Sequence, residues 1–236
     1  MAEIIPAILA KSYEELEEKL DIVAGHTKSV QIDICDGQYV QNRTWPYLKG
    51  TLSGSDQIFD DIISQEKALP HWEEIDFEFD LMVKDPYVKI PDFVSAGATR
   101  VIVHKGSVSD EELRSIIKDF GKDTDLSFFK VELGIALMPG DSPEAIKAIA
   151  DKTDFVQIMG IDRIGFQGQS FDSRALELVK ALKKAYPDLP CAVDGHVDLD
   201  TAKELIKAGT DRLVVGSALF ESPDFLGTLK EFQALS

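Results

Sequence analysis

The chain has 236 residues, of which 44% are hydrophobic, and its formal net charge is −17 at pH 7. A chain of this length suits one large domain, and the hydrophobic fraction is enough for a sizeable core. The excess of acidic side chains argues against a nucleic-acid or anionic-membrane surface, although a local nest of backbone N–H groups can still bind a phosphate group. The N-terminus has no basic region and its apolar run is short, so we predict a cytoplasmic protein with neither a signal peptide nor a membrane span.

Strand-like and helix-like segments alternate along the whole chain. Strands are expected at 4–9, 30–35, 77–83, 100–104, 130–137, 155–159, 191–194 and 212–215. Helices are expected to begin at residues 12, 109 and 142, and another is expected to end at residue 97. Further helices are expected over 57–68, 173–185 and 201–208 and at the C-terminal end of the chain. Eight strand–helix units with short apolar strands predict a parallel sheet, and eight is the number that closes a (β/α)8 TIM barrel. We predict one such barrel as a single domain over 1–236. An open doubly wound sheet is the alternative, but no Gly-x-Gly-x-x-Gly motif follows the first strand.

Local signals mark where several of these helices begin and end. The segments 12–15 and 109–112 read as capping boxes, and Ser142-Pro143 offers an N-cap followed by proline at the first helical position. An Ala-Gly pair, which suits a helix C-cap that turns into the next strand, precedes three strands, at 24–25, 96–97 and 208–209.

Aspartates stand at or near the ends of three predicted strands: Asp33, Asp80 and Asp194. Because parallel strands of a barrel end on one rim, these carboxylates should converge there, together with the amide of Gln31 on the same strand face as Asp33. Carboxylates at such range repel, so we predict a divalent cation held by Gln31, Asp33, Asp80 and Asp194. Oxygen ligands favour Mg²⁺ or Mn²⁺ over Zn²⁺. The alternative is that some of these aspartates cap helices or pair with Arg or Lys.

Glycine turns follow the last three predicted strands. The loop 165–169 follows strand six, Gly195-His196 follows strand seven, and Gly216-Ser217 follows strand eight. Barrels often bind phosphate at this place, through backbone N–H groups. We therefore predict a phosphate site built from Gly165, Gly168, Gly195, His196, Gly216 and Ser217. Three tight turns without a ligand are the alternative.

The loop after the second strand, 37–55, is long and carries aromatic residues that include Trp45. Long loops at the carboxyl ends of barrel strands usually shape the active site, so this loop is expected to form a lid or a substrate wall. A surface excursion with buried aromatics is the alternative.

The chain resembles the ribulose-phosphate 3-epimerase family of phosphosugar-binding barrels. The matching runs are collinear and span nearly the whole chain: IPAIL (5–9), IDICDG (32–37), FDLMV (79–83), GFQGQSF (165–171), VDG (193–195) and GSA (216–218). The resemblance implies that Asp33 and Asp194 are metal ligands and the acid/base pair, one removing the proton of a ketopentose phosphate at C3 and the other returning it on the opposite face. It places Met82 and Met159 near the reacting carbon and His104 at the substrate pocket. It also implies a sugar phosphate as the partner and a homo-oligomer.

Several positions depart from the family pattern. The family has histidine metal ligands where this chain has Gln31 and Asp80, and a serine near the substrate where it has Ala7. His196 stands where the family has a glycine that approaches the phosphate. The retained aspartate pair keeps proton transfer at C3 the favoured reaction, as in the interconversion of D-ribulose 5-phosphate and D-xylulose 5-phosphate.

Two other functions compete with this epimerase. A Schiff-base aldolase would need a lysine at a strand end, and Lys105 is the candidate. A divergent phosphosugar-binding barrel, with a different substrate or without catalysis, is favoured by the replaced histidines.

Overall fold

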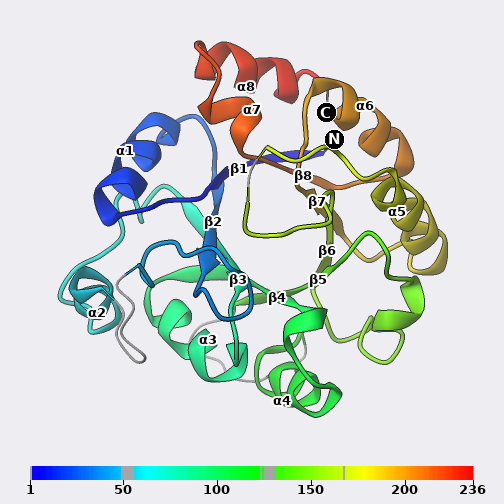
Figure 1. The fold of residues 1–236 in the computed structure, drawn as a ribbon, viewed down its shortest axis with the longest axis horizontal. Helices are drawn as coiled ribbons and strands as arrows, with labels where there is room; N and C mark the ends of the chain where they lie inside the picture. The colour runs from blue at the N-terminus through cyan, green and yellow to red at the C-terminus, as the bar shows by residue number, and fades with distance from the viewer. Residues whose placement is uncertain (1, 49–55, 123, 125–130, 167, 236) are drawn as a thin grey trace.

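The computed structural model describes residues 2–48, 56–122, 124, 131–166 and 168–235. Eight parallel strands close into a barrel in sequence order, and the first strand pairs with the last. The strands are β1 (Glu3–Ile8), β2 (Ser29–Cys35), β3 (Asp76–Met82), β4 (Ala98–His104), β5 (Glu132–Leu137), β6 (Phe155–Met159), β7 (Cys191–Asp194) and β8 (Arg212–Val215). Figure 1 looks along the barrel, with the helices in a ring around it. The predicted TIM barrel is confirmed.

The α-helices are α1 (Tyr13–Val23), α2 (Gln57–Ile63), α3 (Pro86–Ser95), α4 (Asp110–Phe120), α5 (Ser173–Ala185), α6 (Leu199–Ala208), α7 (Ser217–Phe220) and α8 (Phe225–Gln233). Short 3-10 turns lie at Lys105–Ser107 and Pro143–Ile146. No described helix is long and apolar enough to cross a membrane.

The predicted bounds are met at β6, α5, β7 and β8, and the strands β1 to β4 shift by one or two residues. β5 begins at Glu132, and residue 130 of the predicted strand lies outside the described residues. The helix expected over 57–68 ends at Ile63, and Gln65 then adopts a left-handed conformation with φ 64°. The segment after Ser142 forms a 3-10 turn in place of an α-helix. The Ser142 hydroxyl makes no cap bond to the backbone and interacts with the Glu144 side chain.

The helix-end signals are only partly as expected. Ser12 and Ser109 each accept the predicted backbone N–H bond, but the Glu15 carboxylate accepts from the N–H of Lys11 and so does not complete the box. The glycine of each Ala-Gly pair has a positive φ, as a helix C-cap requires: 73° at 25, 99° at 97 and 102° at 209.

Strand alternation separates two apolar regions. Side chains such as Ile32 and Phe79 pack outward against the helices in the main core. Alternate side chains point into the barrel, where Met82, Phe155 and Met159 belong to a second cluster. This alternation directs the side chains of Gln31, Asp33, Asp80 and Asp194 into the barrel near its carboxyl rim.

Candidate active site

Three aspartates meet inside the carboxyl end of the barrel. Asp33 is the register partner of Asp80 across β2 and β3, and Asp194 ends β7. One carboxylate oxygen from each lies within 4.8 Å of the others. Asp80 is fully buried, whereas Asp33 and Asp194 keep part of their surface in the open cleft above. The structure thus brings together the aspartates predicted from their strand-end positions.

Gln31 lies beneath the cluster with its side chain fully buried. Its amide nitrogen donates to Asp33 Oδ1 over 2.8 Å and to Asp194 Oδ2 over 2.9 Å. A primary amide nitrogen carries two hydrogens, so one goes to each carboxylate. Asp194 also accepts a hydrogen bond from the backbone of Gly195.

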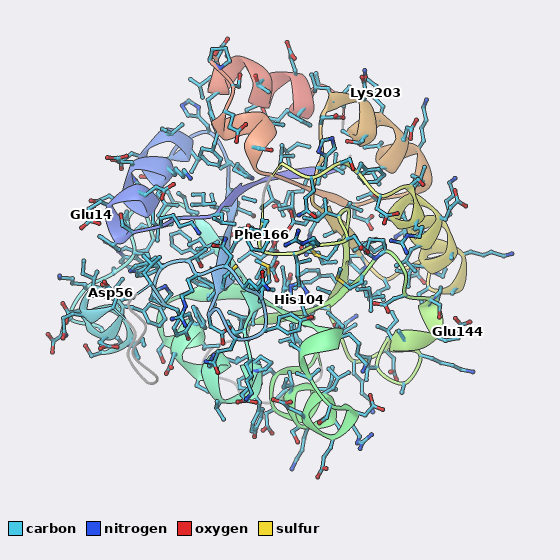
Figure 2. The ribbon with its side chains drawn as sticks, in the orientation of Figure 1. Glu14, Asp56, His104, Glu144, Phe166 and Lys203 are labelled. Atoms are coloured by element: carbon cyan, nitrogen blue, oxygen red, sulfur yellow. The ribbon has the colours of Figure 1, made fainter. Side chains whose placement is uncertain are left out.

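His104 supports the third carboxylate from behind. Its Nε2 lies 2.8 Å from Asp80 Oδ1, and its side chain is almost completely buried. Figure 2 shows His104 near the middle of the barrel. The Tyr39 ring covers the imidazole, with 5.8 Å between the ring centroids. His104 therefore contacts Asp80 and is not among the described residues that line the cleft.

Burial and mutual repulsion favour the protonated forms of the two cleft carboxyls. Burial, then the charges of Asp194 and Asp80, raise the pKa of Asp33 well above its usual range. Burial, then the charge of Asp80, raise the pKa of Asp194 to about 7. The hydrogen bonds from Gln31 act in the opposite direction on both. Without a cation, burial and repulsion therefore favour retention of a proton by this pair of carboxyls.

The donor set fits a divalent cation. Asp80 Oδ2 and Gln31 Oε1 are buried and have no hydrogen-bond partner among the described residues. Such atoms cost free energy unless a partner or an ion satisfies them. A cation at the three carboxylates would satisfy Asp80 Oδ2 and offset the repulsion, and oxygen ligands suit Mg²⁺ or Mn²⁺. The amide oxygen of Gln31 could act as a further ligand only if it faced the ion. In this structure the amide nitrogen faces Asp33 and Asp194.

One open cleft joins the predicted phosphate residues to the aspartate pair. Its empty space is about 600 Å³, its mouth included. Its lining includes Asp33, Asp194, Met82, Met159, Gly165, Gly168, Gly195, His196, Gly216 and Ser217. Gln31, Asp80 and His104 lie beneath this lining, and Ala7 packs against Ile5 and Val214. Residue 167 of the predicted phosphate loop lies outside the described residues.

Two positions at this cleft have a backbone that favours glycine. A Cβ on Gly160 would lie 2.1 Å from the carbonyl oxygen of Gly195, so only glycine fits there. Sequence reasoning did not single out Gly160, although its place directly after β6 was a usable signal. His196 has φ 51°, so it keeps the left-handed backbone that glycine adopts most easily, and its side chain is partly exposed at the cleft.

The described part of the loop after β2, residues 37–48, contributes no residue to the lining of the cleft. Trp45 is buried between Tyr13 and Phe59, with ring centroids 5.7 and 5.3 Å away, so it packs in the helix layer and not over the substrate. Residues 49–55 of the expected lid lie outside the described residues.

The aldolase candidate lies away from the aspartates. Lys105 pairs with Asp110 over 2.9 Å and lines a surface groove beside α4. It is not among the described residues that line the cleft.

The sequence comparisons agree in naming one family. The family model described as "Ribulose-phosphate 3 epimerase family" matches residues 3–220. The chloroplastic ribulose-5-phosphate-3-epimerase of Arabidopsis thaliana is 29% identical over 98% of this chain and 76% of the relative. The ribulose-phosphate 3-epimerase of Bacillus subtilis is 28% identical over 99% of both chains.

Solved structures with lower identity support the fold alone. 3-Hexulose-6-phosphate synthase from Salmonella typhimurium aligns with TM-score 0.69 and 15% identity over 99% of this chain and 97% of that one. The tryptophan synthase alpha-subunit from Pyrococcus furiosus aligns with TM-score 0.64 and 16% identity over 99% and 97%. The family model spans most of the chain and its description matches the predicted resemblance, so this chain belongs to the ribulose-phosphate 3-epimerase family and is an isomerase, as predicted.

Proposed function

We propose that this protein interconverts D-ribulose 5-phosphate and D-xylulose 5-phosphate by moving a proton at C3 between Asp33 and Asp194. One carboxylate takes the C3 proton, and the electrons of the C–H bond move into the C2 carbonyl to give an enediolate. The other carboxyl, protonated at the start, returns a proton to C3 on the opposite face. Each turnover exchanges the protonation states of the two residues.

The observation that carries this proposal is that the two carboxylates share one hydrogen-bond donor. Asp33 Oδ1 and Asp194 Oδ2 accept from the same Gln31 nitrogen, over 2.8 and 2.9 Å. This shared donor holds the groups close together while both contact the cleft. The raised pKa of each fits a pair in which one member holds a proton and the other does not, as proton return requires.

The three aspartates would hold a divalent cation beside this pair. When bound, it would supply a positive charge that polarises the C2 carbonyl and stabilises the enediolate oxygens. Asp80 serves only in this binding role, because His104 engages one of its oxygens and its side chain is fully buried. We propose Mg²⁺ or Mn²⁺ because the carboxylates supply hard oxygen ligands.

The glycine turns would bind the phosphate at the other end of the cleft. Gly195, Gly216 and Ser217 follow β7 and β8, where barrel backbones commonly present N–H groups to phosphate. Short side chains leave the backbone accessible there. His196, partly exposed at the same place, can add a donor to the phosphate oxygens.

The test is ¹H NMR of D-ribulose 5-phosphate in D₂O with the metal-stripped protein, then with Mg²⁺, Mn²⁺ or Zn²⁺ added. We expect deuterium at C3 together with formation of xylulose 5-phosphate, and the largest rate with Mg²⁺ or Mn²⁺. Absence of exchange with every metal would overturn the proposed substrate.

Isosteric Asp33→Asn and Asp194→Asn variants test the two-base mechanism. Each should abolish interconversion, because one proton carrier is lost. The remaining aspartate should still exchange the C3 hydrogen of the one epimer whose proton faces it. Exchange of both epimers by one variant would show that a single base serves both faces and would contradict the mechanism.

A further inference from the structure

Asn42, in the loop after β2, connects three segments that are distant in sequence. Its Nδ2 donates to the carbonyl oxygen of Gly165, 123 residues away, over 2.6 Å. Its Oδ1 accepts from Lys11 Nζ over 2.5 Å and from the backbone N–H of Arg43 over 2.9 Å. Lys11 also donates to the carbonyl oxygen of Arg43 over 2.9 Å. The loop after β2 is thereby fastened to the phosphate loop after β6.

The chemistry of these partners fixes the orientation of the Asn42 amide. The Lys11 ammonium and the Arg43 N–H can only donate, so they must face Oδ1. The Gly165 carbonyl can only accept, so it must face the NH₂ group. Reversing the amide would place a donor against two donors and an acceptor against an acceptor. Lys11 therefore holds Asn42 in the one orientation that engages Gly165.

Gly165 is confined from a second side. It has φ 82°, and a Cβ placed on it would lie 3.0 Å from Val40 Cγ2 and 3.4 Å from Cys35 Sγ. In a trans peptide the carbonyl and the following N–H point in opposite directions. A Gly165 carbonyl held toward Asn42 therefore makes the N–H of Phe166 point away from Asn42, in the opposite direction within the same peptide plane. Gly165 and Phe166 both line the cleft, and Figure 2 shows Phe166 over the middle of the barrel.

We propose that Asn42 is a positioning residue that directs the Phe166 N–H toward the phosphate group of the substrate, and that Lys11 keeps Asn42 in place for this task. The inference rests on the proposed phosphosugar substrate. It identifies a determinant of phosphate binding in a loop outside the glycine turns.

The decisive variant is Asn42→Asp, which keeps an oxygen for Lys11 and Arg43 but cannot donate to Gly165. We expect KM for D-ribulose 5-phosphate and Kd for inorganic phosphate to rise about tenfold, the scale of one charge-assisted hydrogen bond. We expect kcat to change less than about threefold, because Asn42 does not contact the aspartate pair. Asn42→Ala, which removes the donor without adding a charge, should raise both constants similarly.

Two further variants separate positioning from general disturbance. Gln41→Ala changes the neighbouring, exposed residue and should leave KM and Kd unchanged. As a single substitution, Lys11→Met should weaken phosphate binding. Combined with Asn42→Ala it should add little further weakening, because both changes release the same peptide. Melting temperatures within a few degrees of the parent protein confirm that the variants fold.

The outcomes distinguish this inference from the proposed function. Weaker phosphate binding by Asn42→Asp, in a protein that does not epimerise ribulose 5-phosphate, would refute the reaction and keep the inference. Unchanged phosphate affinity in both Asn42 variants would overturn the inference, as would a loss confined to kcat. Equal weakening by Gln41→Ala would also overturn it, because the effect would then belong to the loop as a whole.

Discussion

Replacing Gln31 by methionine removes two hydrogen bonds at once while keeping a similar side-chain volume. Both bonds end on aspartates, and the side chain is fully buried. In the proposed mechanism one aspartate is charged and the other protonated. The two bonds then contribute about 1.5–3 and about 0.5–1.5 kcal/mol, or about 2–4.5 kcal/mol together. Only the part that is stronger in the transition state affects the rate. From the lower half of that range, we expect kcat/KM to fall about 30–200-fold, at about 1.4 kcal/mol per factor of ten.

The pH profile should move in a defined direction. The Gln31 bonds lower the pKa of Asp33 and of Asp194, so their loss raises both pKa values further above the usual range. The proposed reaction needs one carboxylate as a base, and that ionised form becomes populated only as pH rises through its pKa. The acidic limb of kcat/KM should therefore shift to higher pH in Gln31→Met. KM should change less than about threefold, because the phosphate contacts lie elsewhere.

Gln31→Glu is the matched variant that separates the two roles open to this residue. If the amide oxygen binds a cation, a glutamate oxygen should preserve or strengthen Mn²⁺ affinity, measured by EPR titration. If the amide nitrogen is what matters, glutamate cannot donate and should lower C3 exchange at least as much as methionine. Retention of more than about a third of kcat/KM by Gln31→Met would refute the bridging role.

Three more outcomes follow from the site. Without metal, the pKa of Asp194 rises from 3.8 to about 7 on folding, so the folded state holds more protons in that window and stability should fall as pH rises through it. Thermal melts should show this fall, and Mn²⁺ should raise Tm more at pH 8 than at pH 5; a flat profile would contradict the repulsion argument. Without metal, the Asp33→Asn and Asp194→Asn variants should have a higher Tm than the parent protein at pH 8, because each removes one buried charge. A lower Tm for both variants would contradict the repulsion argument. Gly160→Ala should cost more than about 3 kcal/mol in urea unfolding, since its Cβ would overlap a carbonyl oxygen, whereas Gly140→Ala, whose Cβ would have no neighbour nearer than 3.6 Å, is the control.

The barrel and its aspartate rim could be predicted because their signals are local. Each of Asp33, Asp80 and Asp194 stands near the end of a short apolar strand, and closure of the barrel then brings those ends together. The same reasoning placed the glycine turns on one cleft. Local pattern and strand topology were sufficient for both features.

Contacts that depend on how a side chain rotates could not be predicted from the sequence. The presence of a glutamine at position 31 does not indicate whether its amide oxygen or its amide nitrogen contacts the carboxylates. Trp45 lies in a loop that reads as a lid, yet it packs against two rings of the helix layer. The bond between Asn42 and Gly165 joins residues 123 apart, and no periodic signal marks it.

The departures at positions 31 and 80 are best understood together. The family resemblance implies two neutral histidine ligands there, and this chain has one neutral amide and one carboxylate, so the site gains a negative charge. The nitrogen atoms here contact the carboxylates: the Gln31 amide nitrogen bonds Asp33 and Asp194, and His104 Nε2 lies 2.8 Å from Asp80. Such a site should bind hard divalent cations or protons more strongly than a site with two histidines. The substitutions therefore change how the proposed acid/base pair is held and neutralised, while both aspartates of the pair are retained.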